Sequence, residues 1–206
     1  MSGERRAMNG TRIRDLEADD CVLLASLHVN YFGPSIIHDF GEKFLRFCYE
    51  GMVDARWGKT LVFVRNGESL GFATVVFDVR RFFREILARR GFVMGLEVLK
   101  TIARHPGLTG NVLRAARYPG TFAAETKAEL LTLIVREDVR GAGTGSSLIE
   151  EVISILLEKQ LKSFKVSVKK NWTRALDFYI RKGFEIIGEM DDGKEGLLFL
   201  RYDLTR

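Results

Sequence analysis

Residues 130–148, LLTLIVREDVRGAGTGSSL, decide the fold of this chain. The first six form an apolar strand pattern, and a loop with Arg140 and three alternating glycines follows. An amphipathic helix is predicted to begin at Gly143 and to reach Glu158. Backbone without side chains can donate several N–H groups to one ligand, and a helix N-terminus adds the positive end of its dipole. The stretch therefore predicts a strand, an anion-binding loop and a helix, in that order.

The remaining elements predict a mixed α/β sheet in a single domain. Apolar residues at a spacing of two indicate strands, and apolar residues at helical spacing indicate helices. The dipeptide Asn66-Gly67 between two β-rich runs is typical of a hairpin turn. A short first strand ends at Ile13, and a first helix begins within 15–20 and reaches Tyr31. The other expected strands span 60–65, 70–78, 129–135, 164–168, 184–189 and 197–204, and the other expected helices span 38–50 and 143–158, with a last one after Asn171.

The bulk composition is that of a globular protein. The chain has 206 residues, of which 46% are hydrophobic and 29% charged, enough for one well-buried domain. We expect 1–10 to be a disordered lead-in and 11–206 to be a single domain. No apolar stretch reaches the roughly 18 residues that span a bilayer. The N-terminal charges precede no apolar segment, so no secretory signal is predicted and we expect a cytoplasmic protein.

Cysteine and histidine usage indicates neither a disulfide framework nor a metal centre. Cys21 and Cys48 lie within helical apolar patterns and are predicted to be buried structural thiols. His28, His38 and His105 show no ligand spacing with one another or with the cysteines. No metal site is therefore predicted.

The net charge of +5 is unevenly distributed. Residues 80–118 contain nine Lys/Arg and two acids, Glu85 and Glu97, so this segment is +7 and the rest of the chain is −2. The basic character thus belongs to one segment. No aromatic stacking platform or groove-reading motif accompanies it, so nucleic acid is not a predicted partner.

Two common phosphate loops do not match the glycine stretch. A Walker A loop needs Lys-Ser/Thr after its last glycine, whereas Gly145 is followed by Ser146-Ser147. A dinucleotide fingerprint needs Gly-x-Gly-x-x-Gly, and no ribose-binding acid ends the strand that follows. Taken alone, the loop is also compatible with an ordinary tight connection.

A second block follows the loop at about the distance of one helix and one strand. It reads Asn171-x-x-x-Ala175-x-x-Phe178-Tyr179-x-x-Lys182-Gly183-Phe184. Together with Arg140-x-x-Gly143-x-Gly145, it resembles the two motifs of the GNAT superfamily of N-acetyltransferases, over residues 128–190. The resemblance implies a mixed, mostly antiparallel central sheet of about seven strands flanked by helices. It also implies transfer of an acetyl group from acetyl-CoA to an amine, without a metal.

The resemblance assigns the cofactor-binding residues. The backbone of the loop would hold the pyrophosphate of acetyl-CoA, and the end of the preceding strand would pair through its main chain with the pantetheine arm where two strands splay apart. Asn171 would touch the pantetheine or the far end of the cofactor. For Arg140, a surface loop residue is the alternative to a phosphate contact. The complete set is Leu133, Ile134, Val135, Arg140, Gly141, Ala142, Gly143, Thr144, Gly145, Asn171 and Phe178.

Two residues are implied to be catalytic. Tyr179 would lie near the thioester sulfur and donate a proton to the departing thiolate. Its alternative is a core tyrosine that packs beside Phe178. Glu129 is the candidate base for the amine, and its alternative is a strand-entry charge that faces solvent. No cysteine lies in either motif, so we expect direct attack in a ternary complex and no acetyl-enzyme.

The segment 80–121 departs from the family, in which a short loop usually stands at this place. It is predicted to be a basic helical insertion before the cofactor-binding strand. Three interpretations stay open: a helical appendage with a solvated basic face, an interfacial helix on an anionic membrane through 80–118, and a lid that receives an anionic or sugar-phosphate acceptor. Its apolar residues are Phe82, Phe83, Ile86, Leu87, Phe92, Val93, Leu96 and Leu99.

The predicted partners are a coenzyme A thioester and an amine acceptor. The motifs do not choose among amino sugars, polyamines, antibiotics and peptide amines, nor between a monomer and a homodimer. The alternative function is a non-catalytic acyl-CoA-binding or membrane-associated module that keeps the loop and lacks the chemistry.

Overall fold

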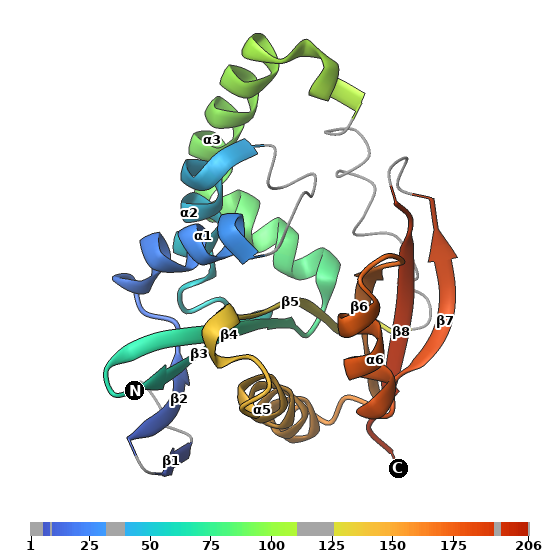
Figure 1. The fold of residues 1–206 in the computed structure, drawn as a ribbon. Coiled ribbons are helices and arrows are strands. Elements are labelled where there is room, and N and C mark those ends of the chain that lie inside the picture. The colour runs from blue at the N-terminus through green and yellow to red at the C-terminus, as the bar shows by residue number, and fades with distance from the viewer. Residues whose placement is uncertain (1–5, 9, 32–39, 111–125, 192–194, 206) are drawn as a thin grey trace.

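The computed structural model describes residues 6–8, 10–31, 40–110, 126–191 and 195–205 (Figure 1). Eight strands form one sheet in the order β1-β2-β3-β4-β5-β6-β8-β7. Of its neighbouring pairs, β5–β6 is the one parallel pair within the described ranges. The strands are β1 Arg6–Met8, β2 Thr11–Asp15, β3 Gly58–Arg65, β4 Glu68–Val76, β5 Glu129–Val135, β6 Ser163–Lys169, β7 Glu185–Met190 and β8 Leu197–Asp203.

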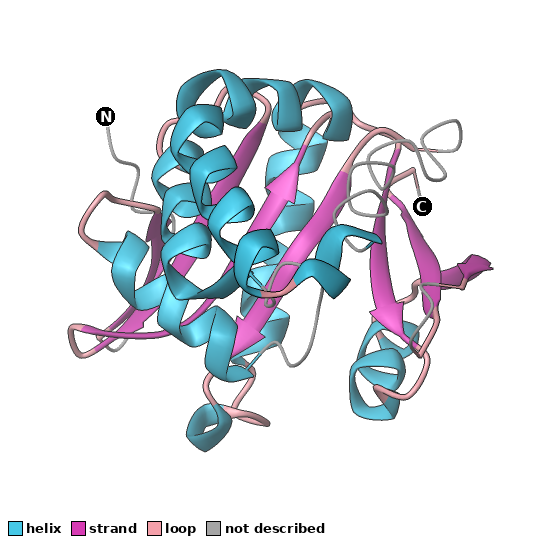
Figure 2. Cartoon of the chain, turned by 90° about the horizontal axis from the view of Figure 1, so that it is seen from above, coloured by secondary structure: helices cyan, strands magenta, loops and turns pink. Residues whose placement is uncertain are grey.

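The helices cover both faces of the sheet. In Figure 1, α1, α2 and α3 lie on one face of the sheet and α5 on the other; Figure 2 shows from above how helices lie across the strands. Two short 3₁₀ turns, η2 Pro106–Leu108 and η4 Glu137–Val139, complete the described elements. The helices are α1 Asp20–Tyr31, α2 Gly41–Met52, α3 Val79–Arg104, α5 Thr144–Glu158 and α6 Thr173–Arg181.

Each face has its own apolar core. On one face, α5 and α6 pack against the central strands through a cluster that includes Leu148, Val152 and Phe164, each fully buried. On the other face, α1 and α2 pack on β3 and β4 through a cluster that includes Leu24 and Phe72. A mixed sheet with both faces covered is the arrangement that the alternating elements predicted.

The predicted hairpin is present, and its turn has the expected backbone. Asn66 and Gly67 join β3 to β4 with φ angles of +51° and +83°. Two successive positive φ values are typical of the type I′ turn, which matches the twist of the two strands. The prediction of the fold class, a mixed and mostly antiparallel sheet flanked by helices, is confirmed.

The lead-in was predicted wrongly in part. Residues 6–8, expected to be disordered, pair with Thr11–Ile13 as an added edge strand. A tight reversal through Gly10, which has a φ of +71°, allows this pairing. The sheet therefore has one strand more than the seven or so predicted.

The basic segment is helical over most of its described length. α3 begins at Val79, ends at Arg104 and is followed by η2. Residues 111–121, the rest of the predicted insertion, lie outside the described residues. Within the described residues, no helix is both long and apolar enough to cross a membrane.

Candidate active site

The two central strands separate after a short pairing. β5 and β6 pair only at Glu129↔Lys165 and Leu130↔Val166. β5 nevertheless remains paired with β4 up to Val135, and β6 remains paired with β8 up to Lys169. Each strand is thus held by its outer neighbour while the edge between them opens.

A cavity lies in this opening. Three segments line it, and Tyr179 of α6 is among the lining residues, whereas Glu129 lies at the first paired position of β5 and β6, one residue before the cavity-lining Leu130. The wall combines apolar side chains with a few hydroxyl groups, as a site for an uncharged thioester arm would require. The lining residues are Leu130, Leu131, Thr132, Leu133, Val166, Ser167, Val168, Trp172, Ala175 and Tyr179.

The backbone of β5 presents alternate peptide groups to the opening. The N–H of Arg136 donates to the carbonyl of Leu70 on β4 at 2.9 Å. Because peptide directions alternate along a strand, Ile134 also faces β4, and Leu133 and Val135 face the opening. The side chain of Ile134 is buried, 3% exposed, on the far face. Of the three predicted strand residues, two therefore have their backbone toward the cavity.

The loop after β5 leaves backbone and space available. Gly141 and Gly143 have φ angles of +82° and +87°, a region that favours glycine. A Cβ at either position would meet nothing within 4 Å. α5 begins at Thr144 with Gly143 as its N-cap and no side-chain capping bond. The first N–H groups of α5 therefore have no intrahelical partner, next to open space that could hold a phosphate.

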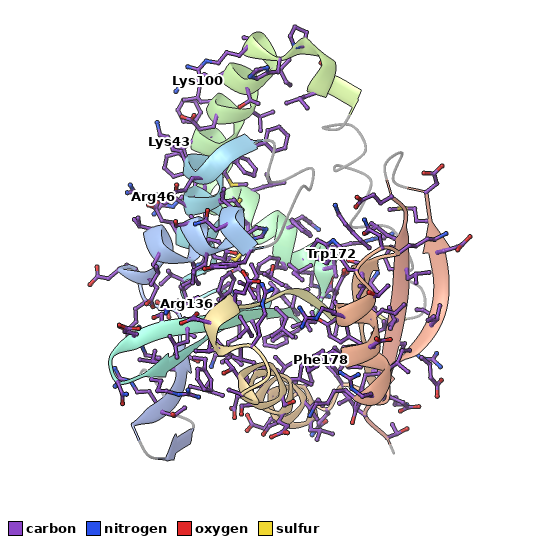
Figure 3. The ribbon with its side chains drawn as sticks, in the orientation of Figure 1. Lys43, Arg46, Lys100, Arg136, Trp172 and Phe178 are labelled. Atoms are coloured by element: carbon purple, nitrogen blue, oxygen red, sulfur yellow. The ribbon has the colours of Figure 1, made fainter. Side chains whose placement is uncertain are left out.

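Thr144 and Gly145 are the first two residues of α5. The hydroxyl of Thr144 is buried and makes no hydrogen bond within the described part of the chain. A Cβ on Gly145 would lie 3.6 Å from the ring of Phe178, so α5 approaches α6 closely at this point. Phe178, labelled in Figure 3, therefore supports the loop from the side of α6. Ala142 lies exposed between the two positive-φ glycines.

Arg140 crosses the end of β5. Its Nε donates to the carbonyl of Val135 at 3.0 Å, and its guanidinium lies 5.7 Å from the ring centre of Tyr31. This side chain is exposed. It therefore ties the loop to the strand end and to α1 at the edge of the predicted phosphate site.

A second arginine, which sequence reasoning missed, anchors the same loop. The guanidinium of Arg136 lies 2.6 Å from the Asp138 carboxylate and 3.3 Å from that of Glu68 at the start of β4 (Figure 3). Its hydrogen bond holds the pKa of Asp138 below its ordinary value. The signal for this contact is weak, because Glu68 lies 68 positions away in the chain.

Tyr179 lies at the junction of the cavity and the core. It is 6% exposed, and its ring packs edge-on against Phe178 and Phe184 with centroid distances of 5.2 and 5.1 Å. Burial raises its pKa above the ordinary value. The phenol therefore keeps its proton at neutral pH and can act as a hydrogen donor. Both interpretations of this residue, donor and core tyrosine, are compatible with its place.

Glu129 does not face solvent, so the alternative of an exposed strand-entry charge is wrong. Its side chain is 0% exposed, and its Oε2 lies 3.5 Å from Nζ of Lys165, which is 2% exposed. That ammonium also lies 5.5 Å from the ring centre of Phe199. A buried carboxylate is expensive unless a cation lies beside it. Lys165, which lies opposite Glu129 in the β5–β6 pairing, was not anticipated from the sequence.

Asn171 lies apart from the cavity lining. It is exposed and precedes α6, whose N-cap is Trp172 without a side-chain capping bond. Trp172, in contrast, lines the cavity, and the Lys169 ammonium lies 5.4 Å from its ring centre (Figure 3). Its position one residue after Asn171 was the only sequence signal for it.

Cys21 and Cys48 are free thiols; Cys21 is buried, as predicted, whereas Cys48 is half-buried. Burial raises the pKa of Cys48 to about 12 and that of Cys21 to about 11. The described ranges contain no group of three or more His, Cys, Asp or Glu that could hold a metal ion.

Comparison with known proteins gives one family and one fold. Residues 102–186 match the family model described as the acetyltransferase (GNAT) domain. No curated protein matches the chain. Among solved structures, the chain is similar to the paia N-acetyltransferase of Thermoplasma acidophilum in complex with coenzyme A, with 14% identity, a TM-score of 0.60, and coverage of 94% of this chain and 98% of that one.

Two further solved structures have the same fold. The ribosomal-protein-S18-alanine N-acetyltransferase of Escherichia coli is 15% identical with a TM-score of 0.57, covering 94% of each chain. The spermidine N-acetyltransferase of Vibrio cholerae is 11% identical with a TM-score of 0.58, covering 96% of each chain. The resemblance predicted from the two motifs is therefore confirmed over residues 102–186, which match the GNAT domain model, and the chain has the fold of these acetyltransferases.

Proposed function

We propose that this protein is an acetyl-CoA-dependent N-acetyltransferase that transfers an acetyl group directly to an amine. The observation that carries the proposal is the opening between β5 and β6, which ends at the uncapped start of α5. An extended arm with a phosphate group at one end and a thioester at the other matches both parts of this site. The open space at Gly141 and Gly143 and the buried hydroxyl of Thr144 support the fit.

In this proposal the chain binds the donor through its backbone. The N–H groups from Gly141 to Gly145 hold the pyrophosphate, and the peptide groups of Leu133 and Val135 align the pantetheine along β5. Phe178 and Ala142 shape the loop, and Arg140 fixes the strand end beside it. Asn171 contacts the cofactor at its far end. Ile134 contributes indirectly to donor binding, because its backbone faces β4 and keeps β5 paired with that strand.

Tyr179 acts as the general acid in the transfer step. The amine nitrogen attacks the thioester carbonyl, the C–S bond breaks, and the phenol gives its proton to the departing thiolate. Burial keeps Tyr179 protonated until that step. The apolar wall excludes water and so limits hydrolysis of the thioester.

Glu129 accepts the proton that the amine releases. It lies at the first paired position of β5 and β6, next to the cavity-lining Leu130. Lys165 stabilises the carboxylate form of Glu129.

The same ion pair favours a second candidate function. A carboxylate that is 0% exposed beside a buried ammonium is also what a purely structural pair looks like. With Glu129 in that role, the domain would be a non-catalytic acyl-CoA-binding module. The acceptor stays open as well, since the named relatives act on amines as different as spermidine and a ribosomal-protein alanine.

The two functions separate in one experiment. Free thiol release from acetyl-CoA is measured with a panel of polyamines, amino sugars, peptide N-termini and lipid-linked amines, while thermal shift reports acetyl-CoA binding. The enzyme is expected to release thiol with at least one acceptor, and Glu129→Gln is expected to lower that rate. Binding without thiol release across the panel would favour the module, and no thermal shift would reject both.

A further inference from the structure

We propose that the outer face of the second half of α3 binds the surface of an anionic membrane. This inference goes beyond the proposed function and does not depend on it. The face consists of Phe92, Leu96 and Leu99, which are 80%, 41% and 65% exposed. Their spacing of four and three residues places them side by side on one helix face. We call these three residues the outer stripe.

α3 packs on the protein through other apolar residues, which lie in its first half. Val79, Phe82 and Ile86 are buried in a cluster with Met52 and Trp57. At about 100° per residue, this buried face is centred about 100° around the helix from the outer stripe, so α3 has two apolar faces, and only the one in its first half is buried. A helical appendage with a solvated basic face accounts for the first face and not for the second.

Polar contacts hold α3 in this orientation. The Glu85 carboxylate accepts the backbone N–H groups of Arg56 and Trp57 at 3.0 and 3.2 Å. The guanidinium of Arg89 donates to the carbonyl of Val53 at 2.7 Å. Farther along, Glu97 pairs with Lys43 of α2 at 3.1 Å. These contacts fasten α3 to α2 and to the segment that follows α2.

The charge of α3 selects an anionic partner. Its 26 residues contain seven Lys/Arg and two acids, a net charge of +5. Both acids are engaged: Glu85 as above, and Glu97 with Lys43 and with Lys100 at 2.9 Å. At about 100° per residue, Arg84 lies on one side of the outer stripe and Lys100 on the other. An apolar stripe between cations is typical of helices that lie in the interface of an anionic membrane.

Other occupants fit the charge less well. A second copy would bring two helices of +5 together, and like charges oppose such pairing. Nucleic acid would pair with the cations but would leave the outer stripe unused. The second half of α3 extends beyond α1 and α2 (Figure 1), and Lys43, Arg46 and Lys100 are labelled along the same side of the molecule (Figure 3). A flat surface can therefore reach the stripe and the cations together.

Vesicle flotation tests this proposal with the full chain. Vesicles of phosphatidylcholine alone are compared with vesicles that also contain phosphatidylglycerol, at low and high salt. We expect flotation with the anionic vesicles and its loss at high salt. The variant Phe92→Ser/Leu99→Ser should reduce the bound fraction about tenfold or more, and Arg84→Glu/Arg104→Glu should do the same. The control Ile186→Ser, at a β7 side chain that is 53% exposed, should float like the wild type.

Each outcome of this experiment either supports or overturns the membrane-binding proposal. Circular dichroism and the acetyl-CoA thermal shift verify that each variant is folded, so loss of flotation in a folded variant supports the proposal. Flotation of the stripe variant at the wild-type level, or no flotation of the wild type, overturns it. A wild-type dimer that the stripe variant converts to a monomer in sedimentation velocity overturns it too, because the stripe would then be an interface between copies. Failure of thiol release with intact flotation would reject only the proposed function.

Discussion

Two helices each follow a strand of the sheet, and their N-termini are capped differently. α3 follows β4 with Asp78 as its N-cap, and this carboxylate accepts the N–H of Arg81 at 3.0 Å. α5 follows β5 with Gly143 as its N-cap and no side-chain bond. The chain satisfies the first helix end with its own carboxylate and leaves the second one open. We propose that the open, positively polarised helix end binds ligand, whereas the capped one is part of the scaffold.

The two helices also differ along the rest of their length, in which of their groups are left available for binding. The inward face of α5 is fully buried against the sheet at Leu148, Ile149 and Val152. The backbone N–H groups that we propose to bind ligand lie in the first turn of α5. The first turn of α3 is capped by Asp78, and its exposed apolar side chains lie farther along the helix, in the outer stripe. In the two proposals, binding at the α5 end depends on backbone geometry and binding at α3 depends on side-chain chemistry.

The largest effect is expected in the cavity between β5 and β6. Tyr179→Phe should lower turnover about 10²- to 10³-fold, because it removes the proton donor to the thiolate, with little change in acetyl-CoA affinity. Tyr49→Phe is the matched control: Tyr49 is also buried, with its hydroxyl 2.7 Å from Nδ1 of His28, on the other side of the sheet. It should cost about 1 kcal/mol of stability and leave turnover intact. Steady-state thiol release measures both, and full activity of Tyr179→Phe would remove this residue from the mechanism.

A large effect on stability is expected at the base of the cavity. Lys165→Met removes the cation beside the buried Glu129 carboxylate and should cost about 3–5 kcal/mol in urea unfolding. Adding Glu129→Gln to this variant should restore part of the loss. Lys170→Met is the control, because its pair with Glu189 at 2.7 Å is solvent-exposed and should be worth about 0–1 kcal/mol. Equal losses from the two lysine variants would show that burial of the Glu129 pair has no energetic consequence.

A glycine-to-alanine substitution is expected to have different effects at the start of α5 and within α3. Gly143→Ala places a Cβ where φ is +87°, which strains the loop by about 1–2 kcal/mol and intrudes on the phosphate space, so acetyl-CoA affinity should fall about tenfold or more. Gly95→Ala, within α3 and with open space around it, should instead stabilise the protein by about 0.5–1 kcal/mol. Titration calorimetry and thermal melting distinguish the two, and unchanged affinity of Gly143→Ala would argue against the loop as a phosphate site.

The smallest effect concerns the capped helix end. Asp78→Ala removes the side-chain acceptor of the Arg81 N–H and should cost about 1 kcal/mol of stability. Acetyl-CoA affinity and turnover should stay at wild-type values. A loss of acetyl-CoA affinity in this variant would contradict the division between a scaffold end and a binding end.

Much of the fold and the donor side of the site was predictable from local sequence. β5 spans Glu129–Val135 as predicted, the hairpin turns at Asn66-Gly67, and α5 begins one residue after the predicted Gly143. Such features depend on residues a few positions apart, through alternation, positive φ at glycine and helical spacing. Phosphate binding by the loop and catalysis by Tyr179 and Glu129 stay predictions that the variants above test.

The sequence by itself determined the order of the elements, the backbone freedom of the loop and the concentration of positive charge in one segment. Only the tertiary structure decided that Lys165 lies beside Glu129, that Arg136 reaches Glu68, and that the outer stripe of α3 faces away from the core. The physical reason is distance along the chain. Strand order and helix docking bring together groups that lie tens of residues apart, and periodicity within one segment carries no information about which of two apolar faces will be buried.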